Sequence, residues 1–139
     1  MSHCFTYGSL MCEDIMSTVC GYGLVGIDAM LAEFDRHPVQ GEDYPAIVPS
    51  AGGCVAGRLY SDVRDAAWER LDRFEGNQYQ RQRVRVVLAD GSPCDAWTYV
   101  FRPAYQGLLL PGDWDFAAFL REGKVRFEGR YLGFQQIEQ

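Results

Sequence analysis

The sequence lacks the motifs of a metal site. It has only two histidines, His3 and His37, and none of its five cysteines is paired in C-x-x-C spacing. Zinc is therefore not expected. Because the cysteine number is odd, we expect reduced thiols that pack as small hydrophobic side chains, not a disulfide framework.

Long apolar runs and basic residues are also scarce. No stretch approaches the roughly 20 apolar residues of a membrane span, and no basic region precedes an apolar core as in a secretory leader. Lys and Arg number 13 against 19 Asp and Glu, a net charge of −6. An acidic surface repels nucleic-acid phosphates and anionic lipid, so we expect neither as a partner. A cytoplasmic enzyme or a small-molecule binding module fits this composition.

The chain does have enough apolar material for one core. Its 139 residues are 47% hydrophobic and 14% aromatic, a composition that excludes disorder and suits a single domain over residues 1–139. No linker or repeat divides it. The glycines form neither a G-x-G-x-x-G motif nor a phosphate-binding P-loop.

Extended segments outnumber helical ones. Two helices are expected, one over 11–20 ended by Gly21 and one that begins at Asp62 and is ended by Gly76. Asp90-Gly91 indicates a hairpin, and Trp97, Tyr99 and Phe101 should share one face of its return strand. Strands are expected at 3–7, 23–34, 44–48, 55–60, 79–88 and 96–101. The pattern predicts an α+β fold with a small, mostly antiparallel β-barrel and flanking helices.

Two regions are less regular. Pro49 and the pair Gly52-Gly53 are expected to close one strand before the next begins. Near the end of the chain we expect a short helix over 115–120 and a final aromatic segment over 131–134.

The segment Tyr7-Gly8-Ser9-Leu10 lies between a strand end and a helix start. Glycine permits a positive φ, which lets successive backbone N–H groups converge on an anion, and a helix N-terminus adds partial positive charge. The loop could therefore hold a carboxylate or phosphate. The alternative is an ordinary strand-to-helix turn in which Ser9 is a local cap.

A second candidate site is the end of the next helix. Asp72 and Glu75 stand in its last turn, where acids oppose the helix dipole by about 0.3–1 kcal/mol. Either both are solvated surface acids, or one carboxyl is buried and its pKa is raised. We expect Asp72 to be a surface or capping acid. Arg81 could pair with an acid at the rim of a pocket, or be a surface charge on a strand.

Four motifs occur in order along the first hundred residues, and together they resemble the γ-glutamylcyclotransferase-like superfamily. They are FTYGSLM at 5–11, YPAIVP at 44–49, VAGRLY at 55–60 and LDRFEG at 71–76, followed by a tyrosine and an arginine. The chain most resembles the short branch that contains γ-glutamylamine cyclotransferases, plant avirulence-induced proteins and bacterial relatives.

The resemblance implies a small barrel with flanking helices and a cavity, without metal or organic cofactor. It implies Glu75 as the catalytic acid/base. It implies a substrate-binding set of Tyr7, Gly8, Ser9, Leu10, Tyr79 and Arg81.

The implied reaction is attack of the α-amine of a γ-glutamyl amine on its γ-carbonyl, which releases 5-oxoproline and a free amine. Two alternatives are a non-catalytic binding module of the same fold and an enzyme with a biosynthetic γ-glutamyl substrate. Glutathione is less expected, because the enzymes that degrade it form a longer, distinct branch.

Overall fold

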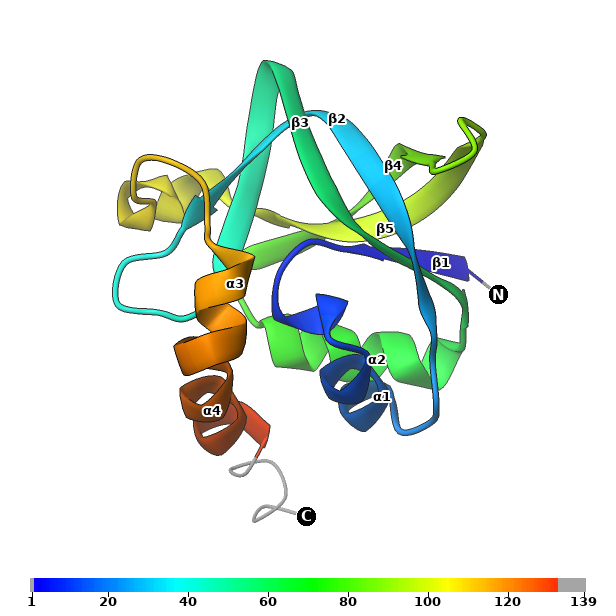
Figure 1. Ribbon diagram of the computed structural model, residues 1–139, viewed down its shortest axis with the longest axis horizontal. Helices are drawn as coiled ribbons and strands as arrows, with labels where there is room; N and C mark the ends of the chain where they lie inside the picture. The colour runs from blue at the N-terminus through cyan, green and yellow to red at the C-terminus, as the bar shows by residue number, and fades with distance from the viewer. Residues whose placement is uncertain (1, 133–139) are drawn as a thin grey trace.

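Five strands close into a small barrel within residues 2–132, the part of the chain that the computed structural model describes (Figure 1). The strands are β1 (Ser2–Thr6), β2 (Gly26–Pro38), β3 (Pro45–Val63), β4 (Tyr79–Leu88) and β5 (Pro93–Phe101). They follow the order β1-β3-β2-β4-β5, and the closing pair β1–β5 is parallel while the others are antiparallel. The expected mixed, mostly antiparallel barrel is thereby confirmed.

The side chains of β5 alternate between the inside and the outside of the barrel. Ala96 and Val100 belong to the core inside it, together with residues of the other strands. Trp97, Tyr99 and Phe101 pack outward against the core shared with the helices. Their position on one face was correctly predicted, because side chains in a strand alternate with a period of two.

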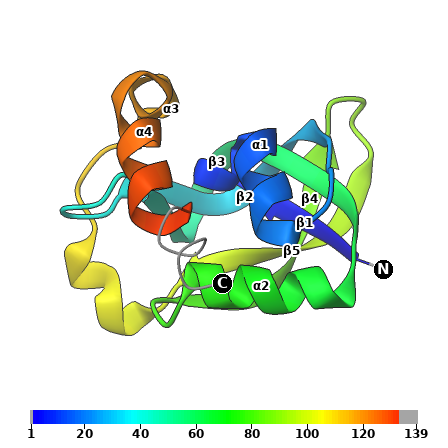
Figure 2. The same cartoon turned by 90° about the horizontal axis from the view of Figure 1, so that it is seen from below.

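Two helices, α1 (Glu13–Cys20) and α2 (Asp65–Glu75), pack against one face of the barrel (Figure 2). Gly21 and Gly76 end them with φ of 86° and 81°, as the sequence predicted. The predicted start of the second helix was wrong. β3 continues to Val63, which pairs with Ser2, so α2 begins only at Asp65.

The two strands expected at 44–48 and 55–60 are one strand, β3, that bends sharply (Figure 1). Pairing with β2 passes from Pro49 opposite Phe34 to Cys54 opposite Ala32, so the residues between them form a bulge. The N–H of Gly52 donates to the Glu33 carboxylate at 2.8 Å. The glycines therefore bend the strand rather than end it.

The C-terminal helical segment, as we call residues 116–132, is longer than the expected helix at 115–120. Short α-helices α3 (Phe116–Ala118) and α4 (Lys124–Phe127) alternate with π-turns Phe119–Gly123 and Glu128–Leu132. The Asp115 carboxylate caps the segment by accepting from the Ala118 N–H at 3.0 Å. Of the expected aromatic stretch, Tyr131 lies in this helical segment, and 133–134 lie outside the described residues. None of the described helices is long and apolar enough to cross a membrane.

Candidate functional site

The loop after β1 is fixed by contacts to distant strands. The Tyr7 hydroxyl donates to the carbonyl oxygen of Tyr99 at 2.6 Å, and the Tyr60 hydroxyl donates to that of Leu10 at 2.8 Å. Tyr7, Gly8, Ser9 and Leu10 all line one cavity. The predicted grouping of these four residues is therefore present.

The reason for a glycine in this loop differs from the expected one. Gly8 has φ −134° and ψ −132°, so it does not use the left-handed region. A Cβ at Gly8 would instead lie 2.7 Å from Cδ of Pro45, at the start of β3. The glycine is required because the loop and Pro45 lie against each other.

Hydrogen bonding in the loop leaves donors free and acceptors occupied. The carbonyl oxygens of Tyr7, Gly8, Ser9 and Leu10 accept from Arg36, Met11, Cys12 and Tyr60, respectively. Within residues 2–132, no acceptor is found for the backbone N–H groups of Gly8, Ser9 and Leu10. Backbone donors without partners beside a cavity suit an anionic group such as a carboxylate.

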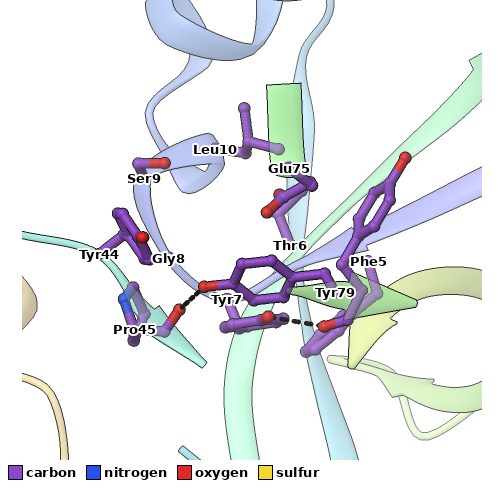
Figure 3. A pocket seen from close by; sticks show the side chains of 11 residues that line it. Phe5, Thr6, Tyr7, Gly8, Ser9, Leu10, Tyr44, Pro45, Glu75 and Tyr79 are labelled. Atoms are coloured by element: carbon purple, nitrogen blue, oxygen red, sulfur yellow. Dashed lines mark hydrogen bonds between the residues drawn. The ribbon is translucent and has the colours of Figure 1, made fainter. Parts of the chain in front are cut away.

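Glu75 is the last residue of α2, and its carboxyl group points toward the loop and the rings of Tyr7 and Tyr79 (Figure 3). The residue is partly buried, and no group in the described chain hydrogen-bonds to its carboxylate. Desolvation, assisted by the negative charge of Asp72, raises the pKa of Glu75 to about 8. The expectation of one buried carboxyl with a raised pKa is met at Glu75. The main physical cause is desolvation, not the helix dipole considered from the sequence.

The cavity has a volume of about 30 Å³, enough for one or two water molecules. Any ligand larger than water therefore requires the walls to move apart. The walls are Phe5, Thr6, Tyr7, Gly8, Ser9, Leu10, Tyr44, Pro45, Glu75, Tyr79 and Tyr99.

Tyr79 lines the cavity, as expected, and its hydroxyl donates to the carbonyl oxygen of Pro45 at 2.8 Å. This bond holds the start of β3 in place beside Gly8. Sequence reasoning did not select Tyr44 and Tyr99 as wall residues. Tyr44 opens the YPAIVP motif, which offered a signal for it, whereas Tyr99 was assigned only to the same strand face as Trp97 and Phe101.

Arg81 lies outside the cavity. Its Nη2 is 3.4 Å from Oδ2 of Asp72, and its guanidinium lies over the rings of Trp68 and Trp97, at 4.7 and 5.5 Å from their centroids. Of the two roles considered for Arg81, pairing with an acid is the one that is present. Asp72 is exposed, as expected, but it also accepts a 2.7 Å hydrogen bond from the Tyr99 hydroxyl. The pair therefore supports a wall of the cavity from behind.

Groups that could hold a metal ion are absent from the described part of the chain, where no three His, Cys, Asp or Glu side chains cluster. All five cysteines lie in that part and are free. The chemistry that the site offers is that of one carboxyl, tyrosine hydroxyls and backbone N–H donors.

Relatives with similar sequences are found in plants. AIG2-like protein D of Arabidopsis thaliana is 34% identical over 118 residues, which cover 84% of this chain and 77% of that protein. AIG2-like protein C of the same plant is 32% identical over 124 residues, which cover 88% and 72%.

Solved structures share the architecture. The solution structure of an Arabidopsis thaliana protein matches with a TM-score of 0.69 at 29% identity, and covers 99% of this chain and 93% of that one. The crystal structure of a Mus musculus AIG2-like protein matches with a TM-score of 0.65, covering 83% and 88%, and at 23% identity it supports the fold alone.

A family model described as "Gamma-glutamyl cyclotransferase, AIG2-like" matches residues 4–116. The match includes the barrel except the first two residues of β1, and it includes the loop after β1 and the end of α2 with Glu75. The chain therefore belongs to the γ-glutamyl cyclotransferase, AIG2-like family.

Proposed function

We propose that the protein is a cyclotransferase that releases 5-oxoproline and a free amine from γ-glutamyl amines. The observation that carries this proposal is the position of Glu75. Its carboxyl, with a pKa of about 8, opens into the same cavity as the three unpaired N–H donors of Gly8, Ser9 and Leu10. Family membership supports cyclotransferase chemistry in general.

Glu75 is the proposed base and acid. The α-ammonium of the substrate cannot attack, so the ionised carboxylate first removes one of its protons. The freed amine attacks the γ-carbonyl carbon and forms the new C–N bond of a five-membered ring. Glu75 then gives this proton to the leaving nitrogen, and the original amide C–N bond breaks. The ring nitrogen, which still carries two hydrogens after the attack, loses one of them to the carboxylate of Glu75 and becomes the N–H of 5-oxoproline. A raised pKa suits both steps, because it strengthens the base and keeps its conjugate acid available near neutral pH.

The loop is proposed to bind the γ-glutamyl part of the substrate. Its N–H groups can bind the α-carboxylate of the substrate or offset the negative charge that develops on the γ-oxygen. Either contact folds the substrate so that amine and carbonyl meet within one molecule, which supplies the proximity that this reaction needs.

Glu75→Gln tests the proposal, because it keeps the shape of the side chain and removes the base. We expect turnover to fall about 10²–10⁴-fold, while substrate affinity changes far less because the loop is intact. The measurement is 5-oxoproline release from a panel of γ-glutamyl amines, followed by mass spectrometry.

Glu69→Gln is the matched control, since Glu69 is an exposed glutamate on the same helix. Asp72 is unsuitable, because it bonds to Tyr99 in the cavity wall. Normal turnover in Glu75→Gln would remove Glu75 from the mechanism. If the wild type binds γ-glutamyl compounds but never releases 5-oxoproline, the protein is a binding module.

A further inference from the structure

A second cavity of about 60 Å³ adjoins the first on the side of the C-terminal helical segment. The two cavities share Ser9, Tyr44, Glu75 and Tyr79 as walls. Glu75 therefore borders both of them. A substrate whose bond is broken at Glu75 can therefore have one of its two parts in each cavity.

The remaining wall of the second cavity is aromatic. It consists of Phe74 from α2, and of Phe127 and Tyr131 from the C-terminal helical segment, which lies beside α1 and α2 in Figure 2. The ring centroid of Phe127 is 4.8 Å from that of Tyr131 and 5.8 Å from that of Phe74. The centroids of Tyr44 and Tyr131 are 6.0 Å apart. The slot is smaller than the ~150 Å³ cavity that takes a benzene ring. A straight alkyl chain is narrower than an aromatic ring, so it needs less movement of these walls to enter.

Polar contacts hold this aromatic wall against the rest of the molecule. Lys124 Nζ lies 2.8 Å from Asp14 Oδ2 on α1, and the Tyr131 hydroxyl donates to the Glu42 carboxylate. The Trp114 indole N–H donates to the carbonyl oxygen of Asp43 at 3.0 Å, just before the segment begins. The segment that carries two of the rings is thereby held against α1 and against the residues just before β3.

Positive charge is missing from the walls described for this cavity. Three arginines directly precede its rings in the sequence, namely Arg73, Arg126 and Arg130. Arg73 is exposed on α2, and the other two are each paired with an acid. Arg126 lies 2.8 Å from Asp43. Arg130 lies 3.1 Å from Glu42, with its guanidinium over the Tyr131 ring at 5.6 Å from the centroid, so Glu42 offsets its charge. A carboxylate in the slot would meet aromatic rings and the acidic Glu75, and no wall residue described for the slot is a cation that could offset its loss of water.

We propose that the second cavity binds the leaving amine and selects amines with an uncharged apolar body over amines that carry a carboxylate, such as amino acids. This proposal rests on the proposed function, because the leaving nitrogen must lie at Glu75 to receive its proton. With the γ-glutamyl head at the loop, the rest of the amine then extends between Tyr44, Phe74, Phe127 and Tyr131.

Two substrates of equal length test the selection. They are γ-glutamyl-n-butylamide and γ-glutamyl-4-aminobutyrate, which differ in that a terminal methyl group is replaced by a carboxylate. We expect kcat/KM to be at least about 10-fold higher for the butylamide, because a buried carboxylate without a partner loses hydration. An equal or reversed preference in the wild type overturns the proposal.

Tyr131→Lys places a cation at the wall, and its ammonium group can pair with the carboxylate of γ-glutamyl-4-aminobutyrate. It should therefore reduce the preference for the butylamide about 10-fold. Val125→Lys adds the same charge on the same segment, but at a side chain that is 74% exposed. It should leave the preference unchanged. If both lysine variants narrow the preference equally, the effect is one of overall charge, and the cavity is not the site of selection.

The variant Glu75→Gln should bind the butylamide without converting it, so it separates a failure of this proposal from a failure of the proposed function. Binding of the butylamide to this variant is followed by NMR of the aromatic rings of Phe74, Phe127 and Tyr131. If wild type turns over neither substrate but the butylamide shifts these resonances, the binding site stands and the cyclotransferase function falls. If the butylamide binds or reacts without shifting them, the proposed cavity assignment is overturned.

Discussion

At Glu75, two effects act in the same direction on one carboxyl group. Desolvation disfavours its ionised form, and the negative charge of Asp72 adds to the effect. A glutamate with a pKa of about 8 is protonated in a large share of molecules at neutral pH. It is nevertheless a much stronger base, once ionised, than a solvated glutamate.

The charge of Asp72 gives a prediction about pH dependence. Asp72→Asn removes a negative charge near Glu75 and also frees the positive charge of Arg81, so the ionised Glu75 becomes more favourable. We expect the pKa of Glu75 to fall by up to about one unit. Carboxyl ¹³C NMR titration measures it directly, with Glu75→Gln to assign the transition.

Activity should follow the same titration. Because the ionised form is the base, kcat/KM in the wild type should rise as pH increases through about 8. In Asp72→Asn, the rising limb should move to lower pH. A limb that stays in place or moves upward would show that Asp72 does not act on Glu75.

Gly8 gives a prediction about crowding. Its φ is not positive, so the effect argued for Gly8→Ala is that of the added Cβ. The new Cβ would collide with Pro45 and displace the loop, and a shift of ~1 Å in a catalytic site can cost about 10²-fold in rate. We expect turnover to fall by that order, while overpacking lowers the free energy of unfolding by about 1–3 kcal/mol and leaves the barrel folded. Gly8→Val should abolish binding of γ-glutamyl compounds.

Gly23→Ala is the control for this prediction, because Gly23 is exposed and no atom lies within 4 Å of its added Cβ. Both variants are compared in 5-oxoproline release and thermal unfolding. Undiminished turnover in Gly8→Ala would show that the loop tolerates the displacement and is not the substrate-binding element.

At the scale of elements, the sequence predicted the bounds of strands and helices wherever neighbouring residues determine them. The alternating β4 was predicted with its observed bounds, and Gly76 marked the end of α2 because its φ of 81° favours glycine. β3 was split in two because Gly52-Gly53 normally indicates a turn. The strand continues because Glu33, distant in sequence, satisfies the N–H of Gly52.

In the candidate site, too, the sequence did not predict features that depend on contacts between distant residues. The sequence indicated the loop and Glu75, which lie in short motifs, but not the aromatic wall of Phe127 and Tyr131. Their spacing of four residues suits one helical face, yet what that face covers depends on how the C-terminal segment packs. Such packing is fixed by long-range contacts, among them the pair Lys124–Asp14.

Gly57 gives a prediction about how two elements meet. A Cβ there would overlap the carbonyl oxygen of Thr6 and lie 2.6 Å from the Phe5 ring, so β1 could not stay against β3. Overpacking of this kind typically costs about 1–3 kcal/mol, so we expect Gly57→Ala to lose that much free energy of unfolding. Urea denaturation measures it.

Gly107→Ala serves as the comparison for Gly57→Ala, because nothing lies within 4 Å of its added Cβ. Gly57→Ala should have a lower urea midpoint than Gly107→Ala. A Gly57→Ala protein as stable as the comparison would show that the β1–β3 contact readjusts without cost.

Across the whole molecule, the thiols report how tightly the chain is packed. Cys54 is exposed and Cys94 partly exposed, whereas Cys4, Cys12 and Cys20 are buried. Burial raises the pKa of all three buried thiols, that of Cys20 to about 11, so their reactive thiolate forms are suppressed. In the native protein, an alkylating reagent should modify Cys54 first and Cys94 more slowly.

Unfolding without reductant should make all five thiols reactive, as counted by mass spectrometry. Cys54→Ser should remove the fastest phase and nothing else. A count below five in the unfolded, non-reduced protein would indicate a disulfide, and would contradict both the free thiols and the expected reducing environment.

The bond from Tyr7 to Tyr99 joins residues 92 positions apart in the sequence. It also lies beside the β1–β5 pair, which closes the barrel. Contacts between such distant residues form slowly, since the chain between them must first be ordered. During synthesis the loop and Glu75 both emerge before Tyr99 does. A nascent chain at that stage holds the proposed base and anion-binding loop unanchored, so activity should appear only after β5 has been made and joined to β1.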